Sequence, residues 1–342
     1  MSARLPSIQY KRIAGLFEQA ERIWTSRPDV QKAYPDICHW EFWYWLMWHG
    51  SREYSEIAEL IYPDPPSHLM HRVVGQEATS RSFLESGLVD WRRLYLSLVE
   101  GGFNFDAGGR VLDFGCGCGR ILRLFSRYAA TCDLYGGDVD AEAVNYCAST
   151  LDFARFSVLG KLPPTSFPRE SFDAVYAFSV FSHLPERVHR LWLEDLFRIM
   201  RPAGILVLTV QGRRVIEKMI ARQLGGLSRL RFPLPLFRRV IERMIARFLD
   251  YDIPSSKDLQ RDLPEIERTG FAFYPYRQLK FDDFRNQQHF DEWDLETYGS
   301  CFIMESYIRK QWTDLFQVVS WHAAPDDWQD YVILARLQER RS

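Results

Sequence analysis

The chain has 342 residues, a formal net charge of −2 and a pI of about 6.5. This length predicts about two domains, or one large domain with additions. Hydrophobic residues make up 46% of the chain and charged residues 26%, which excludes a disordered or low-complexity protein and, with the near-zero net charge, argues against a surface that coats nucleic acid.

The first 75 residues are predicted to be helical, with an amphipathic helix over 11–24. The segment 39–49 holds six aromatic rings, which predicts that it is either buried all round or half buried with its other half lining a pocket. The proline-rich stretch 62–67 predicts a turn or linker, and 82–102 predicts a second amphipathic helix that ends at two glycines.

From residue 110 onward, short apolar runs alternate with helical patterns. Such alternation predicts a parallel sheet that is covered on both faces. The predicted strands are 110–114, 132–138, 154–159, 172–179 and 204–210, and the predicted helices are 118–129, 140–151 (with Asp140 as N-cap), 185–200 and 305–312. At the end of the chain, strands at 315–321 and 328–337 are predicted to pair in an antiparallel hairpin.

A repeated basic segment interrupts this alternation. Residues 213–224 and 238–249 match at ten of twelve positions, and 213–249 contains ten basic and two acidic residues. Three interpretations stay open: a helical hairpin packed on the domain with solvated arginines, a patch that meets an anionic membrane, and a clamp for an anionic acceptor.

The chemistry is concentrated between residues 111 and 138. A predicted strand carries Asp113 near its end and is followed by glycines at every second position, 115, 117 and 119. Glycines there allow a sharp turn and a close approach of a ligand to the main chain. The next predicted strand ends in Asp138, where a carboxylate can accept hydrogen bonds from both hydroxyls of a ribose. The pair therefore predicts a site for a nucleoside-containing cofactor.

The spacing and charge of this loop select among such cofactors. Dinucleotide sites use GxGxxG, whereas this loop reads DxGxGxG. An acidic residue beside the loop repels phosphate but suits a free ammonium group. S-adenosylmethionine (SAM) has that ammonium group, a ribose and no phosphate.

Four segments give the chain a resemblance to class I SAM-dependent methyltransferases: VLDFGCGCGR, YGGDVDAEAV, SFDAVYAFSVFSHLPE and LFRIMRPAGILVLTVQG. The resemblance implies an α/β, doubly wound, seven-stranded and mostly parallel sheet of order 3-2-1-4-5-7-6, with a helical N-terminal extension and a helical insertion after strand five. It also implies SAM as cofactor and S-adenosylhomocysteine (SAH) as product.

By this resemblance, Asp113 lies near the SAM amino group, Asp138 holds the ribose and Val139 packs on the adenine. The full set of implied cofactor-binding residues is Asp113, Gly115, Cys116, Gly117, Gly119, Asp138, Val139, Leu162 and Ser179. The chain departs from many family members because 158–164 contains no carboxylate, so main-chain atoms near 160–162 are expected to replace it at the adenine. It also lacks the Asn/Asp-Pro-Pro-aromatic loop of enzymes that methylate base amines, which makes nucleic acid an unlikely acceptor.

The candidate general base is His183, which follows the fourth predicted strand at the same edge as the glycine loop. Its alternative is a structural histidine, and His322, His289 and His49 are weaker candidates for the base. The six cysteines form no metal-binding spacing, so we expect reduced thiols and no metal site.

Together these observations predict three parts: an aromatic-rich helical cap over 1–75, a SAM-binding core over 76–212 and 298–342, and a basic insertion or lid over 213–297. The predicted function is O-methylation of a small or glycan-like acceptor: a sugar, glycolipid or secondary metabolite. The alternatives are N-methylation of an amine or peptide and a non-catalytic scaffold. With neither signal peptide nor membrane span in the sequence, a cytoplasmic protein is expected, with peripheral membrane contact through 213–249 left open.

Overall fold

The computed structural model describes residues 7–35, 42, 45–58, 60–75, 78–223, 254, 256–275, 298–323 and 328–338. The chain divides into two compact units. The first comprises Met1–Leu96, Asn104–Val111 and Cys116–Val158, and the second comprises Ser97–Phe103, Leu112–Gly115 and Leu159–Ser342. The three-part division made from the sequence stays a prediction.

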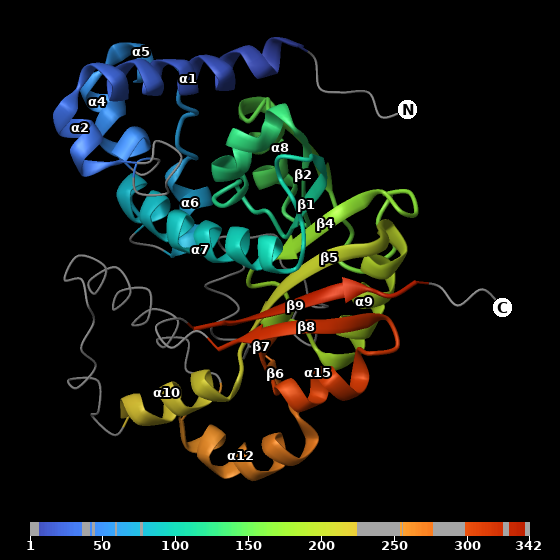
Figure 1. Cartoon of the computed structure of the whole chain (residues 1–342). Helices are drawn as coiled ribbons and strands as arrows, with labels where there is room; N and C mark the ends of the chain where they lie inside the picture. Colours follow the sequence, from blue (N-terminus) through green and yellow to red (C-terminus); the bar gives the residue numbers. More distant parts are fainter. Residues whose placement is uncertain are drawn as a thin grey trace. The chain divides into compact units, whose positions relative to one another are not determined.

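The central element is a seven-stranded sheet of order β3-β2-β1-β4-β5-β9-β8 (Figure 1). Since β6 and β7 form a separate sheet, β8 and β9 are the sixth and seventh strands of this one, and the predicted order 3-2-1-4-5-7-6 and fold class are confirmed. β2 pairs with β3 and β4 with β5 in parallel, while β9 is antiparallel to both β5 and β8. The strands span Gly109–Phe114 (β1), Cys132–Asp138 (β2), Ala154–Val158 (β3), Phe172–Ala177 (β4), Met200–Val210 (β5), Phe316–His322 (β8) and Asp330–Arg336 (β9).

Helices make up most of the first unit outside its strands. They are α1 (Ser7–Ser26), α2 (Pro28–Ala33), a π-helix η1 (Leu46–Gly50), α4 (Ser51–Glu53), α5 (Ser55–Ala58), α6 (Ser67–Val74), α7 (Ser80–Glu100, whose last turn belongs to the second unit) and α8 (Ala141–Thr150). Asp140 caps α8 as predicted, since its side chain accepts hydrogen bonds from the N–H groups of Glu142 and Ala143.

The described rings of the aromatic segment 39–49 belong to a buried cluster. Phe42 is fully buried and Trp45 nearly so. Their ring centroids lie 5.4 Å apart, and Tyr34 contacts both. For these residues the buried alternative is therefore the correct one.

Two sequence predictions were wrong in detail. Instead of an α-helix over 118–129, turns lead into the 3₁₀ helix η2 (Leu122–Ala130), because Gly117 and Gly119 adopt left-handed backbone that an α-helix cannot contain. The expected stop at 201–204 is instead part of β5, where Ala203 has a φ of 62° and the pairing with β4 shifts register.

The second unit contains α9 (Glu186–Ile199), the 3₁₀ turn η3 (Phe181–His183), α10 (Arg213–Gln223), α12 (Ser256–Thr269) and α15 (Glu305–Gln311). A second, two-stranded sheet joins β6 (Phe271–Pro275) to β7 (Gly299–Ile303) in antiparallel register. This sheet is absent from the elements predicted above, because its two strands are separated by a long segment and each is too short to show clear alternation.

The apolar side of α10 is covered within the second unit. Val215 and Ile216 are fully buried in a cluster that includes Leu259 of α12 and Phe302 of β7. On the basic side, Arg213 pairs with Glu217 and Glu267. The first repeat thus follows the interpretation of a packed helix, whereas the second repeat, 238–249, lies outside the described residues.

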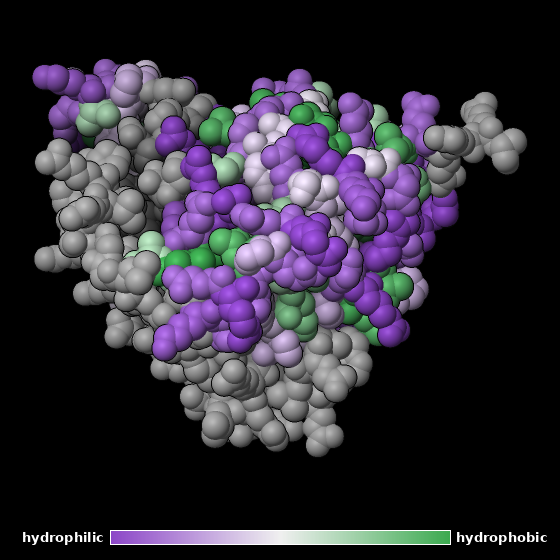
Figure 2. Space-filling view, turned by 90° about the horizontal axis from the view of Figure 1, so that it is seen from below, coloured by the Kyte–Doolittle hydropathy of each residue, from purple (hydrophilic) through white to green (hydrophobic). Residues whose placement is uncertain are grey.

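The described helices include none with the length and apolar character that a membrane span requires. Figure 2 shows one face of the molecule, on which hydrophilic side chains predominate among the coloured residues and hydrophobic ones are scattered in small groups.

Candidate functional site

In the first unit, Asp138 lies at the carboxyl end of β2 and is held by the main chain. Its Oδ2 accepts a hydrogen bond from the Gly117 N–H at 2.7 Å, and its Oδ1 accepts one from the Asp140 N–H at 2.9 Å. Burial raises the pKa of this carboxyl, and hydrogen bonds from the main chain of Asp140, Gly117 and Val139 act in the opposite direction. Because a carboxylate has about four acceptor positions, Asp138 keeps capacity for a further donor.

The glycine loop has a conformation that requires glycine. Gly117 has a φ of 51°, and a Cβ there would lie 2.8 Å from Val73 Cγ1 of α6. Gly119 has a φ of 77°, and a Cβ there would lie 2.6 Å from Leu151 Cδ1. Any side chain would therefore strain the backbone and collide with its neighbours. The Cys116 N–H donates to the Gly137 carbonyl at 3.1 Å, which attaches the loop to the end of β2.

Helix α6 contacts both the glycine loop and the start of α8. Arg72 donates to Asp140 Oδ2 at 2.7 Å and to Glu142 Oε2 at 2.6 Å, and its side chain is only 11% exposed. Leu69 and Met70 of the same helix pack on Cys118. Burial raises the pKa of the Cys118 thiol to about 12, so it is protonated and not nucleophilic at neutral pH.

Two apolar side chains remain open to solvent beside Asp138. Val139 is 53% exposed and Val158 is 50% exposed, and Val158 is the register partner of Asp138 on β3. Since large hydrophobic side chains are mostly buried in this structure, an exposed pair beside a carboxylate is suited to contact a flat apolar ring.

The second unit contains the other residues predicted to bind the cofactor. Asp113 is 2% exposed within β1, and Leu162 is 38% exposed in the segment after β3. Gly115 has a φ of 86°, and a Cβ there would lie 2.3 Å from Val180 Cγ2. The cofactor roles of these residues stay predictions.

Ser179 and His183 lie together in the second unit. Ser179 has a φ of 59°, an unusual value for a non-glycine residue, and its N–H donates to Thr209 Oγ1 at 2.7 Å. Its Oγ lies 3.4 Å from His183 Nε2. The His183 Nδ1 lies 3.0 Å from the Gly299 carbonyl oxygen, so Nδ1 carries the proton and Nε2 presents its lone pair toward Ser179.

Burial also sets the protonation state of His183. The side chain is nearly enclosed, and its ring stacks on Tyr298 with centroids 5.1 Å apart. Burial lowers the pKa of His183 to about 4, although the hydrogen bond to Gly299 acts in the opposite direction. His183 is therefore a neutral imidazole at physiological pH, oriented for its Nε2 to accept a proton.

Part of the chain is similar to a known protein family. Residues 111–204 match a family model described as a methyltransferase domain. By this match, residues 111–204 form a methyltransferase domain. The match covers the glycine loop, Asp138 and His183, and it confirms the resemblance drawn from the four sequence segments.

Curated relatives of this methyltransferase domain differ in the acceptor that they name. A sterol 24-C-methyltransferase of Candida albicans is 32% identical over 109 residues, which cover 30% of this chain and 28% of that protein. A fatty-acid O-methyltransferase of Mycolicibacterium smegmatis is 31% identical over 103 residues, which cover 30% of this chain and 37% of that protein. The chain thus spans well under half the length of either relative.

Among the solved structures that are similar to this chain is magnesium protoporphyrin IX methyltransferase of Synechocystis with bound SAH. It is 15% identical with a TM-score of 0.43, over 78% of this chain and 93% of that chain. The N-methyltransferase NodS of Bradyrhizobium japonicum, also with SAH, is 11% identical with a TM-score of 0.41 over 80% of this chain and 100% of that chain.

Sequence reasoning missed part of the surroundings of His183 in the methyltransferase domain. Gln329 Nε2 donates to Ser179 Oγ at 2.7 Å across 150 residues of sequence, and Gly299 is 116 residues from His183. No local motif marks either residue. Among the weaker histidine candidates, His322 is half exposed and bonded to Glu100 at 2.6 Å, and His49 lies in η1 of the first unit. His289 lies outside the described residues.

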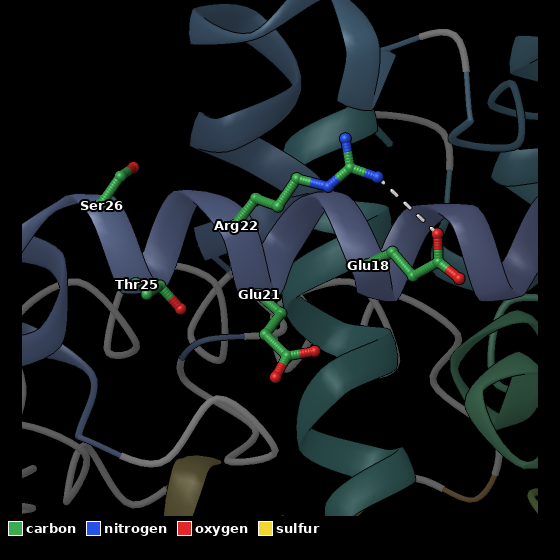
Figure 3. Close-up of a pocket in the computed structure, with 5 residues that line it drawn as sticks. All are labelled: Glu18, Glu21, Arg22, Thr25 and Ser26. Atoms are coloured by element: carbon green, nitrogen blue, oxygen red, sulfur yellow. Dashed lines mark ion pairs between the residues drawn. The ribbon is translucent and has the colours of Figure 1, made fainter.

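A shallow hollow beside α1 is separate from these groups. It is lined by Glu18, Glu21, Arg22, Thr25 and Ser26, with an ion pair of 3.8 Å between Arg22 and Glu18 (Figure 3). All five residues are exposed. The hollow therefore lacks the buried, oriented groups that a specific ligand site requires.

Proposed function

We propose that the chain is a SAM-dependent methyltransferase that methylates a hydroxyl group of a sugar, glycolipid or secondary metabolite. The observation that carries the proposal is the Asp138 carboxylate. It is fixed by the Gly117 and Asp140 N–H groups beside a glycine loop, and its oxygens can accept hydrogen bonds from hydroxyl donors.

The residues present fit SAM. Asp138 would accept hydrogen bonds from the ribose hydroxyls, and the exposed Val139 and Val158 would contact the adenine. Asp113 is an acidic residue that suits the ammonium group of the methionine moiety. The same acidic character disfavours the pyrophosphate of a dinucleotide.

When bound, SAM supplies a sulfonium methyl group, whose carbon forms the new bond to an acceptor lone pair while the old C–S electron pair stays on sulfur in SAH. The electrophile is already activated by its charge, so most of the protein's contribution is alignment of the acceptor. A hydroxyl acceptor must also lose its proton, and His183 Nε2 is the candidate to receive it.

The alternatives predict different behaviour. An amine acceptor needs less help from a base, so N-methylation would depend little on His183. A scaffold would bind SAM without transferring its methyl group. The names of the curated relatives suggest lipid acceptors, a sterol and a fatty acid, and a glycolipid would share an apolar part with both.

The insertion after β5 is proposed to act on the acceptor side. Ten basic residues in 213–249 suit an anionic acceptor or an anionic membrane surface. Of these two, the anionic acceptor is favoured over the membrane surface. The apolar side of α10 is packed within its own unit, so this helix has no apolar face left to contact lipid.

Calorimetry with the full chain tests the cofactor. We expect SAM and SAH to bind and NAD to give no binding heat, because the carboxylates suit a ribose and an ammonium group but repel a pyrophosphate. Transfer of labelled methyl groups to a panel of sugars, glycolipids and amines then tests the activity. Tighter binding of NAD than of SAM would contradict the cofactor assignment.

A second prediction concerns His183 as the base. With an accepted hydroxyl substrate, His183→Ala should lower kcat by at least about a hundredfold and leave SAM affinity unchanged. Because the pKa of His183 is about 4, the imidazole is neutral above that value and can accept a proton there. At saturating SAM, the wild-type kcat should therefore not decline as pH falls through 6.5, the ordinary histidine value, and should decline only as pH approaches 4.

His322→Ala is the matched control, since His322 is exposed and lies in the same unit. It should retain the wild-type rate. If His183→Ala stays within about threefold of wild type, His183 is a structural residue and not the base.

A further inference from the structure

Two glutamine residues in the second unit adjoin the last residue pair of the β5–β9 ladder. Val210 pairs with Asp330 there, Gln211 follows Val210 along the chain, and Gln329 precedes Asp330. Side chains of directly opposite residues point to the same face of a sheet. Thr209 and Tyr331 are opposite each other in the same ladder, and Gln329 lies beside Thr209 because both bond Ser179.

Both amides are buried with one oxygen unused. Gln211 and Gln329 are each only 4% exposed. The Oε1 atom of each is buried and has no hydrogen-bond partner anywhere in the described part of the chain. A buried carbonyl oxygen without a donor opposes folding, so such groups are rarely kept without a reason.

The neighbouring contacts fix one of these oxygens in place. Gln329 Nε2 donates to Ser179 Oγ at 2.7 Å, which leaves its Oε1 as the free end of the amide. Ser179 is in turn held by Thr209 and lies 3.4 Å from His183 Nε2. The unused oxygen of Gln329 thus belongs to the same polar cluster as the candidate base, and Gln211 lies two residues after Thr209, which bonds Ser179.

We propose that Gln211 and Gln329 recognise the methyl acceptor, and that they select a group that presents two hydrogen-bond donors, such as an ammonium or a pair of neighbouring hydroxyls. This inference rests on the proposed function and narrows its substrate class. An amide oxygen only accepts hydrogen bonds. A carboxylate would place negative charge against two carbonyl dipoles, and an ether or hydrocarbon would leave both oxygens unpaired.

A matched series of probes that share an unbranched six-carbon chain tests this selection: hexane-1,2-diol, hexylamine, hexanoate and hexyl methyl ether. Dissociation constants are measured by ligand-observed NMR on full-length protein saturated with SAH. We expect the diol or the amine to bind at least about tenfold more tightly than hexanoate and the ether, because a site built around buried polar groups rejects analogues that leave them unpaired.

Leucine substitutions test whether the two amides cause the preference for the diol or the amine over hexanoate and the ether. In Gln211→Leu and Gln329→Leu the preference should fall to less than about threefold. Gln317→Leu, an exposed glutamine on β8, should keep it. Thermal unfolding provides a readout that needs no ligand: Gln211→Leu should keep or raise the Tm, because it removes an unsatisfied buried oxygen.

Several results would overturn the inference: hexanoate or the ether binding as tightly as the diol and the amine, preference retained in both leucine variants, or binding of none of the four probes. A lower Tm for Gln211→Leu would show that its amide is structural and would overturn the inference as well. These failures differ from failure of the proposed function, because absence of SAH binding would be seen in the calorimeter before any probe is added.

Discussion

Replacing Asp138 with alanine is expected to weaken SAM binding by about a hundredfold to ten-thousandfold. Hydrogen bonds to a charged group contribute about 1.5–3 kcal/mol each, and the variant removes the acceptor of two of them. The partly buried position of Asp138 and its two main-chain donors keep the carboxylate in one place. Calorimetry at neutral pH measures the change in dissociation constant.

Asp133→Ala is the control for this experiment, since Asp133 lies near the start of the same strand, β2. It should bind SAM as the wild type does. Circular dichroism should show that both variants keep the secondary structure. A dissociation constant for Asp138→Ala within about fivefold of the wild-type value would remove Asp138 from the cofactor site.

The same carboxylate predicts a pH dependence. Burial raises the pKa of Asp138 above the ordinary value of 3.8, and only the ionised form is a full acceptor for two hydroxyls. SAM affinity should therefore be fully present above the raised pKa and should be lost as pH falls through it. The loss should begin at a higher pH than an ordinary aspartate would give.

The second large effect is expected on stability. Arg120, which directly follows the last glycine of the loop, donates to Asp90 Oδ2 of α7 at 2.6 Å, and both side chains are less than a tenth exposed. Asp90→Ala would leave the Arg120 charge buried with its carboxylate partner removed. Such a change costs about 3–5 kcal/mol in the free energy of unfolding. Urea denaturation of the full chain measures it.

Two further variants serve as controls for this prediction. Glu194→Ala removes one partner of an exposed pair, Arg190 and Glu194, which also lie 2.7 Å apart. It should cost no more than about 1 kcal/mol. The double variant Asp90→Leu with Arg120→Met removes both buried charges and should recover most of the lost stability. A loss below about 1 kcal/mol for Asp90→Ala would show that the buried pair contributes little.

Apart from the strand order, which the family resemblance implied, the sequence by itself was sufficient for the parallel sheet, the glycine loop and the position of Asp138. The reason is that each of these depends on neighbours along the chain. A strand, a turn and the next strand specify where the loop and the acidic residue lie, and continuous apolar strands between helices indicate a parallel sheet. Even the cap of α8 by Asp140 follows from a local rule.

Local patterns failed where two conformations share one spacing of apolar residues. The run 118–129 fits an α-helix by periodicity, but the left-handed backbone at Gly117 and Gly119 delays helical structure to Leu122, and there it is 3₁₀. The strand β5 begins at Met200, four residues before its predicted start. Pairing with β4 extends the strand to Met200, and the apolar pattern of one segment does not reveal which other segment will pair with it.

The surroundings of His183 were decided by tertiary structure alone. Its Nδ1 bonds a carbonyl 116 residues away, and Ser179 bonds an amide 150 residues away. Gln329 comes next to the end of β5, which Gln211 follows, only because β9 returns antiparallel beside β5 in one register. A shift of that register by one residue would turn the side chain of Gln329 to the other face. The residue types proposed to bind a nucleoside are therefore readable along the chain, whereas the polar groups proposed to choose the acceptor are brought together only by strand pairing between distant segments.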